Sequence, residues 1–369
     1  MKAKVIAYYL PQYHPFPEND QWWGKGFTEW TNVARALPLY KGHYQPKIPA
    51  DLGFYDLRLP IIREEQAQLA RESGVYGFCY WHYWFGNGKQ LMANIFDEVL
   101  ETGKPDFPFC LGWANHSWYA KNWNSTDAGK KDKLLIEQTY PGEHDIRMHY
   151  EYVLKAFRDH RYIMQDGKPI FVIFAPHMLP ENYPLIKLWN EWAKVDGFSK
   201  GIFFIANYVP SSMEEMEGDK WLDLGFSAVI PQRLKKILLD SKEASIKHRI
   251  YDAINRHIME IALPGRHDYS EVYKYFDCPI ADNRETVIPT VIPNFDHSPR
   301  SKRMAYILDN STPELFYEHC SRVFENIKNK KNKLVWLRSW NEWGEGNYME
   351  PDMRYGHGYL NALRKALME

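Results

Sequence analysis

The chain has 369 residues, of which 45% are hydrophobic and 16% aromatic, with 14 Trp and 25 Tyr. Its formal net charge of −1 argues against a protein whose affinity for nucleic acid would come from neutralising phosphates. The many Trp and Tyr side chains combine a flat apolar face with a hydrogen-bonding edge, which is typical of a sugar-binding cleft.

Short apolar, β-branched or aromatic runs alternate along the chain with longer segments of helical periodicity. In chain order, the predicted elements are the strand Val5–Leu10, the helix Asp56–Ser73, the strand Val75–Tyr80, the helix Ala93–Thr102, the strand Phe107–Trp113, the helix Ile146–Met164, the strand Pro169–Ala175, the helix Pro184–Val195, the strand Gly201–Ala206, the helix Met213–Leu222, the strand Phe226–Pro231, the helix Lys242–Ile261, the strand Val287–Ile292, the helix Pro313–Lys328, the strand Leu334–Arg338 and the helix Gly358–Met368. Before Pro313, the spacing of Ser311 and Glu314 resembles a capping box.

Nearly continuous apolar strands, each followed by a helix, predict a parallel sheet that is covered on both faces. Eight such units predict an α/β fold, a (β/α)8 TIM barrel forming a single domain over residues 1–369. A doubly wound open sheet is the alternative, but no GxGxxG or P-loop follows any strand. Long loops after the first strand (Tyr13–Ile48) and the sixth (Arg233–Thr286) should lie at the end where a barrel builds its site.

The cysteines and the N-terminus bear on where the protein resides. Cys79, Cys110, Cys278 and Cys320 are far apart and form no CxxC pair, which indicates reduced thiols in a cytoplasmic protein. The apolar stretch at the N-terminus is too short for a signal peptide. No run of about 18 apolar residues is present, so we expect a cytoplasmic protein without a transmembrane segment.

Polar and aromatic side chains follow nearly every predicted strand, where a barrel carries its active site. A barrel stabilised by packing alone has no need of them. The residues expected to contact a sugar are Tyr13, His14, Glu29, Trp30, Trp81, His82, Trp84, Trp113, Asn115, His116, Trp118, Asn207, Tyr208, Asp296, Trp340, Asn341 and Trp343. The four tryptophans from Trp81 to Trp118 are either sugar platforms or core residues, and Glu29 either binds a hydroxyl or holds backbone amides in a loop.

The last predicted strand is followed by Glu342 and Glu345, two carboxylates three residues apart, beside Trp343 and flexible glycines. Such a pair suits glycoside chemistry, in which one group protonates the leaving oxygen and the other assists attack. We expect their environments to separate their pKa values, leaving one carboxyl protonated near neutral pH. The alternative is a pair of solvated loop glutamates.

Four histidines, His14, His82, His116 and His297, also follow strands, but they show no HxH or HExxH spacing. Hydrogen bonds from these side chains to sugar hydroxyls are therefore preferred over a metal centre. We predict no metal and no cofactor. The expected partner is an oligosaccharide or polysaccharide substrate, and not a nucleic acid.

Five segments carry a resemblance to a known family: AYYLPQYHP, WWGKGFTEW, WHYWF, GWANHSW and RSWNEWGEGNYMEPD. From start to finish, the chain resembles the bacterial WbsX-type family, named as glycosyltransferases from polysaccharide-biosynthesis loci. That family is related to glycoside hydrolase family 99, the endo-α-mannosidases. As a set, the five segments are specific to this resemblance.

The catalytic EWxE segment of family 99 is matched here by residues 342–345. The resemblance implies a (β/α)8 barrel, no metal, and cleavage with retention of anomeric configuration. It further implies that Glu342 deprotonates the 2-hydroxyl of the sugar, which attacks the anomeric carbon, and that Glu345 acts as acid and then base. Family 99 usually has a histidine at the position of Gly344, so contacts to the sugar are expected to differ here.

Three functions remain open from the sequence. The first is a retaining glycoside hydrolase that cleaves an α-mannoside-like bond in a polysaccharide. The second is a glycosyltransferase of bacterial surface polysaccharide (lipopolysaccharide or O-antigen) biosynthesis, although the chain has no DxD motif to hold a metal–nucleotide and no Rossmann-type halves. The third is a non-catalytic carbohydrate-binding barrel, because function belongs to the site and not to the fold.

Overall fold

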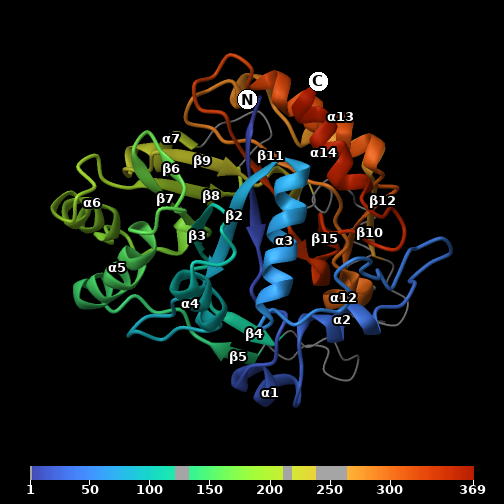
Figure 1. Ribbon diagram of the computed structural model, residues 1–369, viewed down its shortest axis with the longest axis horizontal. Coiled ribbons are helices and arrows are strands. Elements are labelled where there is room, and N and C mark those ends of the chain that lie inside the picture. Colours follow the sequence, from blue (N-terminus) through green and yellow to red (C-terminus); the bar gives the residue numbers. More distant parts are fainter. Residues whose placement is uncertain (1, 121–132, 211–217, 238–263) are drawn as a thin grey trace.

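The computed structural model describes residues 2–120, 133–210, 218–237 and 264–369 (Figure 1). Its centre is a parallel sheet in the order β11-β13-β1-β2-β3-β7-β8-β9. The strands of this sheet are β1 (Lys4–Tyr9), β2 (Val75–His82), β3 (Phe109–Trp113), β7 (Lys168–Ile173), β8 (Phe203–Tyr208), β9 (Ala228–Pro231), β11 (Thr290–Val291) and β13 (Leu334–Leu337). Each of the eight overlaps a strand expected from the sequence.

The two ends of the sheet meet and close it. Val229 of β9 forms a parallel bridge to Val287, just before β11. The amide of Val229 donates to the carbonyl of Thr286, and the amide of Ile288 donates to the carbonyl of Val229, both at 2.8 Å. The prediction of a (β/α)8 barrel is therefore confirmed, and the open doubly wound sheet is wrong.

The apolar character of the strands follows from closure. In β1, Val5, Ile6 and Ala7 are all fully buried, since one face of the strand points into the barrel and the other lies under helices. The register sets Val5 beside Val335 and Ala7 beside Leu337 of β13. A strand buried on both faces needs an apolar residue at nearly every position, which is why it has no polar alternation.

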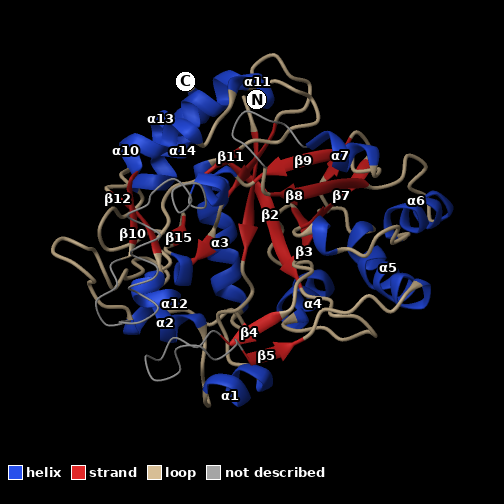
Figure 2. Ribbon diagram, turned by 180° about the vertical axis from the view of Figure 1, so that it is seen from behind, coloured by secondary structure: helices blue, strands red, loops and turns tan. Residues whose placement is uncertain are grey.

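Helices surround the strands, as Figure 2 shows. They are α3 (Pro60–Ser73), α4 (Ala93–Thr102), α5 (Glu143–Phe157), α6 (Leu185–Val195), α7 (Gly218–Asp223), α13 (Pro313–Asn326) and α14 (Gly358–Met368). The bounds expected for α4 and α14 are confirmed. The helix expected over Lys242–Ile261 lies outside the described residues, as does the first part of the one expected over Met213–Leu222.

Two local predictions were wrong. Helix α5 ends at Phe157 and not at Met164, because the buried Arg161 donates to the carbonyls of Val99 and Pro105, both at 3.0 Å, and β6 (Met164–Gln165) then pairs with β7. The N-cap of α13 is Thr312, whose hydroxyl accepts from the amide of Leu315 at 3.3 Å. The hydroxyl expected to cap it, that of Ser311, donates instead to the carbonyl of Pro293.

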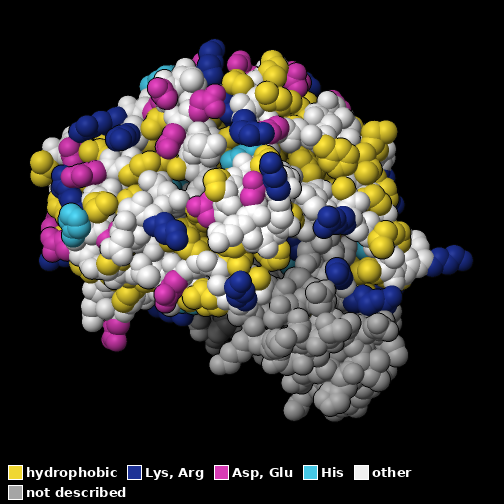
Figure 3. Space-filling model, turned by 90° about the horizontal axis from the view of Figure 1, so that it is seen from below, with side chains coloured by type: hydrophobic (Ala, Val, Ile, Leu, Met, Phe, Trp, Pro, Cys, Tyr) yellow, Lys and Arg dark blue, Asp and Glu magenta, His cyan; other side chains and the backbone are white. Residues whose placement is uncertain are grey.

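The remaining elements belong to the loops between these strands and helices. They are α1 (Pro17–Trp23), α2 (Glu29–Arg35), β4 (Trp118–Ala120), β5 (Lys133–Ile136), η2 (Pro176–Met178), β10 (Gly265–Asp268), α10 (Tyr269–Val272), η3 (Tyr273–Tyr275), α11 (Pro279–Asp282), α12 (Ser298–Ser301), η4 (Lys302–Met304), β12 (Tyr306–Asp309), β14 (Asn341–Glu342), η5 (Trp343–Glu345) and β15 (Asn347–Tyr348). Figure 3 views the molecule from the side where α1, β4 and β5 lie, and hydrophobic side chains there alternate with scattered charged ones. None of the helices in the described ranges combines the length and hydrophobicity needed to cross a bilayer.

Candidate active site

A cavity of about 630 Å³ lies at the C-terminal ends of the barrel strands. Its volume falls within the range of small-molecule sites, about 300–1,000 Å³. Side chains from several strands or the loops after them line it, among them Tyr8, Trp81, Asn207, Arg300, Arg338, Glu342 and Glu345. The cavity therefore occupies the end of the barrel where catalytic groups from different strands converge.

The segment that carries the two glutamates is held by the first loop of the barrel. The side chain of Asn341 accepts a hydrogen bond from the amide of Leu10 at 2.7 Å and donates to its carbonyl at 3.1 Å. The hydroxyl of Tyr13 donates to the carbonyl of Asn341 at 2.6 Å and accepts from the amide of Trp343 at 2.9 Å. Asn341 and Tyr13 thus fix the backbone on both sides of Glu342.

A buried carboxylate, Glu350, holds the same segment from behind. It accepts hydrogen bonds from Trp343 Nε1 at 2.6 Å, Gln66 Nε2 at 2.6 Å and the hydroxyl of Tyr55 at 2.9 Å. Burial raises the pKa of Glu350 to about 7, against the opposing effect of these donors. Sequence reasoning missed Glu350, although it stands within the last of the five segments, because nothing in its spacing shows that it is buried.

Arg300 joins three carboxylates at the edge of the cavity. Its Nη1 lies 2.7 Å from Glu345 Oε1 and its Nη2 lies 3.3 Å from Glu342 Oε2. Its Nε donates to Glu29 Oε2 at 3.0 Å, so that α12 and α2 both contribute to the cluster. The sequence analysis named the three glutamates but missed Arg300, whose one signal is its place shortly after the seventh strand.

Gly344 makes room for this ion pair. A Cβ atom at position 344 would lie 2.2 Å from Glu29 Oε2 and 2.9 Å from Arg300 Nε. Any side chain there would displace the Glu29–Arg300 pair from its present position. Family 99 usually has a histidine at this position. Here the Glu29–Arg300 ion pair occupies the space that such a side chain would need.

The environments of the two glutamates differ. Burial, and then the nearby charge of Glu345, raise the pKa of Glu342 to about 7, while Arg300 opposes the shift. The indole of Trp81 donates to Glu342 Oε1 at 3.1 Å. The side chain of Glu345 is 22% exposed, with Arg338 Nη2 at 3.9 Å and His297 Nε2 at 4.0 Å. Glu342 is thus not a solvated loop residue, and it titrates near neutral pH.

The structure brings together some of the side chains expected to contact a sugar. Besides the two glutamates, those that line the cavity are Glu29, Trp81, His116, Trp118 and Asn207. Trp81 stacks on Tyr8, with ring centroids 4.3 Å apart. Of the four tryptophans for which two interpretations were open, Trp81 and Trp118 line the cavity, while Trp84 and Trp113 are buried in the core.

The other expected contact residues lie away from the cavity lining, and their polar atoms mostly bond to the protein. They are Tyr13, His14, Trp30, His82, Trp84, Trp113, Asn115, Tyr208, Asp296, Trp340, Asn341 and Trp343. His82 follows Trp81 directly and therefore points to the opposite side of its strand, where its Nε2 lies 2.8 Å from that of His149. Asn115 bonds to the backbone of Ala175 through both side-chain atoms, at 2.8 and 2.9 Å.

Several residues that line the cavity were not among those expected to contact a sugar. Those that matter most to its chemistry are Tyr8, Tyr83, Gln232, Arg300 and Arg338. Tyr8 lies inside the first predicted strand, where an inward-pointing ring cannot be told from an outward-pointing one by composition. Arg338 follows the eighth strand directly and Arg300 lies in the loop after the seventh. Their places after strand ends were the only indication in the sequence that these two arginines line the cavity.

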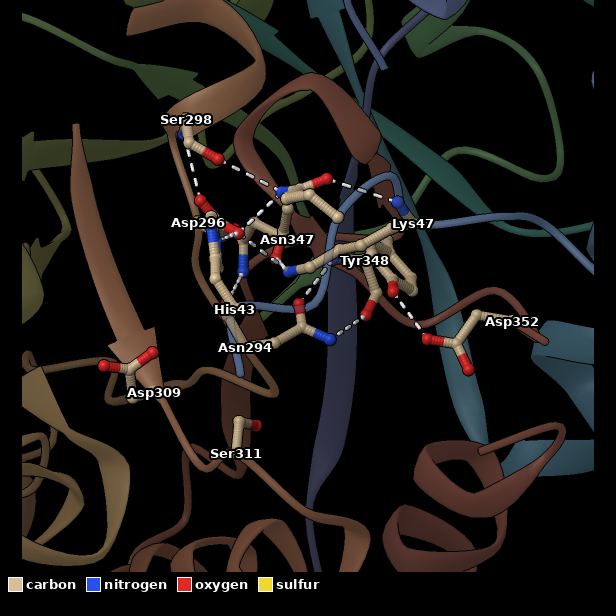
Figure 4. A network of polar contacts seen from close by, with 12 residues as sticks. His43, Lys47, Asn294, Asp296, Ser298, Asp309, Ser311, Asn347, Tyr348 and Asp352 are labelled. Carbon is tan, nitrogen blue, oxygen red and sulfur yellow. Dashed lines mark hydrogen bonds and ion pairs between the residues drawn. The ribbon is translucent and has the colours of Figure 1, made fainter. Parts of the chain in front are cut away.

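Asp296 belongs to a network of polar contacts that includes His43 and Ser298 (Figure 4). Its carboxylate accepts from Gln45 Nε2 at 2.6 Å and lies 2.9 Å from His43 Nε2, and its amide donates to the carbonyl of Glu345 at 2.7 Å. Although burial opposes it, Lys47 at 3.9 Å and His43 hold the pKa of Asp296 well below its ordinary value. Asp296 therefore positions the backbone of Glu345 without lining the cavity.

The Asp296→Asn variant is expected to lose about tenfold in kcat/KM and about 2–4 kcal/mol of stability, because it removes the charge that compensates Lys47 and His43 in a buried place. Thermal unfolding and steady-state kinetics measure the two losses. Asp106→Asn, at an exposed position, is the matched control and should change neither. Wild-type values of both quantities for Asp296→Asn would contradict the positioning role.

The chain matches a sequence family and two curated proteins. Residues 5–363 match the family described as Glycosyltransferase WbsX. The chain is 34% identical over 371 residues to a protein of Xanthomonas campestris pv. campestris called "Uncharacterized protein WxcX", and 34% identical over 374 residues to its counterpart in strain B100. These matches cover 100% of this chain and 50% of each relative, so the chain spans about half the length of the curated relatives it matches.

Solved structures resemble the barrel at low sequence identity. An endo-α-mannosidase of glycoside hydrolase family 99 from Bacteroides thetaiotaomicron is 15% identical, with a TM-score of 0.54, covering 99% of this chain and 96% of that one. A "glycoside hydrolase-like protein" is 14% identical, with a TM-score of 0.59, covering 99% and 93%. At such identities the likeness shows the fold alone.

Proposed function

The chain belongs to the family described as Glycosyltransferase WbsX, and we propose that this barrel is a catalytic domain that breaks a bond at the anomeric carbon of a sugar. The proposed reaction is retaining cleavage of an α-mannoside-like glycosidic bond in an oligosaccharide or polysaccharide. The observation that carries it is the pair Glu342 and Glu345, joined by Arg300 at the edge of one cavity. We further propose that residues 1–369 form this domain as one unit.

In the proposed mechanism, Glu342 takes the proton from the 2-hydroxyl of the sugar as that oxygen attacks the anomeric carbon. A carboxylate whose pKa is about 7 is a stronger base than an ordinary glutamate, and about half of it is ionised at neutral pH. Glu345 gives a proton to the leaving oxygen as the glycosidic bond breaks. It then takes a proton from the water that attacks the anomeric carbon, while the bond from O2 to that carbon breaks and Glu342 returns its proton to O2. The indole of Trp81 donates to Glu342 and its ring lines the cavity, so it is placed both to orient the base and to support the apolar face of a sugar.

Analysis of the first-formed anomer by NMR tests this function. The protein is incubated with a panel of α-mannosides, α-rhamnosides and bacterial surface polysaccharides, and Glu345→Gln serves as the blank. We expect an α-configured product before mutarotation, from the wild type alone. An inverted product would contradict the roles given to the two glutamates, and equal product from the blank would contradict the site itself.

Transfer of the sugar to another glycan is the second candidate. The family's description favours it. Transfer and hydrolysis share the same steps at the anomeric carbon and differ in whether a hydroxyl of an acceptor or of water completes the reaction. The ratio of coupled to hydrolysed product at increasing acceptor concentration separates them. A binding protein without catalysis would instead keep its oligosaccharide affinity after loss of both glutamates.

A further inference from the structure

We propose that the wall of the cavity formed after the seventh and eighth barrel strands binds a phosphate group of the substrate, with Arg338 as its main ligand. The inference rests on the proposed function, since it takes this cavity as the place where the sugar binds. It adds a substrate class: a sugar that carries a phosphate close to the bond that is broken.

Arg338 is placed to receive an anion. It follows β13 directly and lines the cavity, and its guanidinium carbon lies 5.9 Å from the centroid of the Phe295 ring. Within the described ranges, its side chain makes no hydrogen bond, and its nearest carboxylate is that of Glu345, 3.9 Å away. Its donors therefore face the cavity without a protein acceptor among those residues.

The other two arginines of the lining are already engaged. Arg233 donates to Asp282 at 2.7 Å and to the carbonyl of Phe276 at 3.2 Å. Arg300 is paired with three carboxylates, as described above. The contrast singles out Arg338, because it is the arginine of the lining whose hydrogen-bonding capacity remains for a ligand in the described part of the chain.

An uncharged sugar could accept hydrogen bonds from Arg338 but would leave its charge in place. Cleavage at an anomeric carbon develops positive charge on the sugar, which a nearby cation opposes; Glu345, 3.9 Å away, offsets part of the charge of Arg338, and an anion on the substrate would offset more. The planar fork of a guanidinium matches two phosphate oxygens and forms short, charge-assisted hydrogen bonds with them. A phosphate on the substrate would therefore satisfy Arg338 and offset its effect on the reaction.

The position in the fold agrees with the chemistry. TIM barrels frequently bind phosphate with the loops that follow strands 7 and 8. Here β11 and β13 are the seventh and eighth strands, and the loop after β11 also contributes His297, whose Nε2 lies 4.0 Å from Glu345 Oε1. Arg338 and His297 thus approach Glu345 from two neighbouring loops. A phosphate bound between them would lie beside the glutamate proposed to act on the leaving oxygen.

Two kinds of substrate carry a phosphate in this position. One is a sugar 1-phosphate ester, in which the phosphate is the leaving group. The other is a glycan in which the cleaved sugar bears the phosphate on another hydroxyl, such as the 6-hydroxyl. The recognition chemistry is the same for both, and comparison of α-mannose 1-phosphate with mannose 6-phosphate as ligands distinguishes them.

Titration calorimetry at constant ionic strength tests the subsite, with inorganic phosphate as the probe. We expect wild-type protein to bind phosphate and Arg338→Gln to bind it at least about tenfold more weakly, because a charged, two-pronged donor is lost. Arg338→Lys should fall between the two. Arg364→Gln, an exposed arginine on α14, is the matched control and should bind as the wild type does. Thermal unfolding of each variant verifies that it is folded.

Absence of phosphate binding by the wild type, or equal binding by Arg338→Gln, would overturn the inference. Binding of a mannuronate in place of phosphate would overturn it as well. Since Glu342→Gln and Glu345→Gln should still bind phosphate, the result is independent of catalysis. Turnover of uncharged glycosides without phosphate binding would remove the subsite and leave the proposed function. Phosphate binding through Arg338 without turnover of any substrate would support the subsite and contradict the proposed function.

Discussion

Replacing Glu345 with Gln is expected to lower kcat by between about 10² and 10⁴-fold, the range typical for loss of a general acid–base group. The amide has nearly the shape of the carboxyl, but it can neither donate the proton to the leaving oxygen nor take one from water. The melting temperature should change little, because the side chain is partly exposed and Arg300 keeps two other carboxylates. Turnover in the NMR assay and thermal unfolding measure the two effects.

An exposed glutamate on α3, Glu64, provides the matched control for this substitution. Glu64→Gln carries the same change of charge and volume far from the cavity and should leave kcat and the melting temperature as they are. If Glu345→Gln retains wild-type kcat, Glu345 is not the acid–base group. If it loses kcat together with its fold, the loss says nothing specific about catalysis, and Glu345→Asp then tests the role, since a displaced carboxyl should restore part of the activity.

Replacing Arg300 with Met is expected to destabilise the protein by about 3 kcal/mol near pH 8, because it leaves Glu29, Glu342 and Glu345 close together without their shared cation. The pKa of Glu342 is already raised to about 7 in the presence of Arg300, and removal of the cation should raise it further. Chemical denaturation of wild type and variant at a series of pH values measures the difference in the free energy of unfolding.

The sign of the pH dependence is part of this prediction. When the pKa of a carboxyl is higher in the folded protein than in the unfolded chain, the protein loses stability as the pH rises through the pKa of the folded state. The deficit of Arg300→Met should therefore grow between pH 5 and pH 8 and be small at the acid end of that range, where the glutamates take up protons. If Glu342 is the base, kcat/KM of the wild type should fall below about pH 7, and in the variant this limb should move to higher pH.

Arg147→Met on α5 is the matched control for the loss of an arginine. Arg147 forms an exposed ion pair with Glu151, so its removal should cost less than about 1 kcal/mol at every pH. A deficit of Arg300→Met that is small, or that shrinks as the pH rises, would show that the three glutamates do not depend on Arg300 for their charge.

The barrel, and the end of it that holds the large cavity, could be derived from the sequence. Each strand is buried on both faces and is therefore apolar throughout, whereas each helix has apolar residues at helical spacing. Each strand and each helix can therefore be recognised from its own segment of the sequence. The pair Glu342 and Glu345 could be singled out for a related reason: two carboxylates after an apolar strand, beside a ring and glycines, have no packing role. Both inferences depend on residues that are neighbours along the chain.

The direction of each side chain could not be derived in this way. Trp81 and His82 are neighbours in one segment, yet Trp81 lines the cavity and His82 does not. Successive residues of a strand point to opposite sides, and the sequence does not say which side faces the interior of the barrel. Trp113 ends β3 and is buried in the core, whereas Trp118 begins β4 and lines the cavity, which the sequence does not indicate either. Composition at a strand end therefore overestimated the number of side chains in contact with the cavity.

The sequence by itself determined the features that depend on residues close together in the chain. These are eight apolar strands, the helices between them, and two glutamates at the end of the last strand. What the tertiary structure alone decided is the set of partners. Arg300 lies 42 and 45 residues from Glu342 and Glu345, and 271 from Glu29, yet it joins all three. The pKa of Glu342 depends on such neighbours and on burial, and position 344 has no room for a side chain because Glu29 and Arg300 meet beside it. Electrostatic energy and burial depend on distance in space, which chain order does not encode until the barrel has closed.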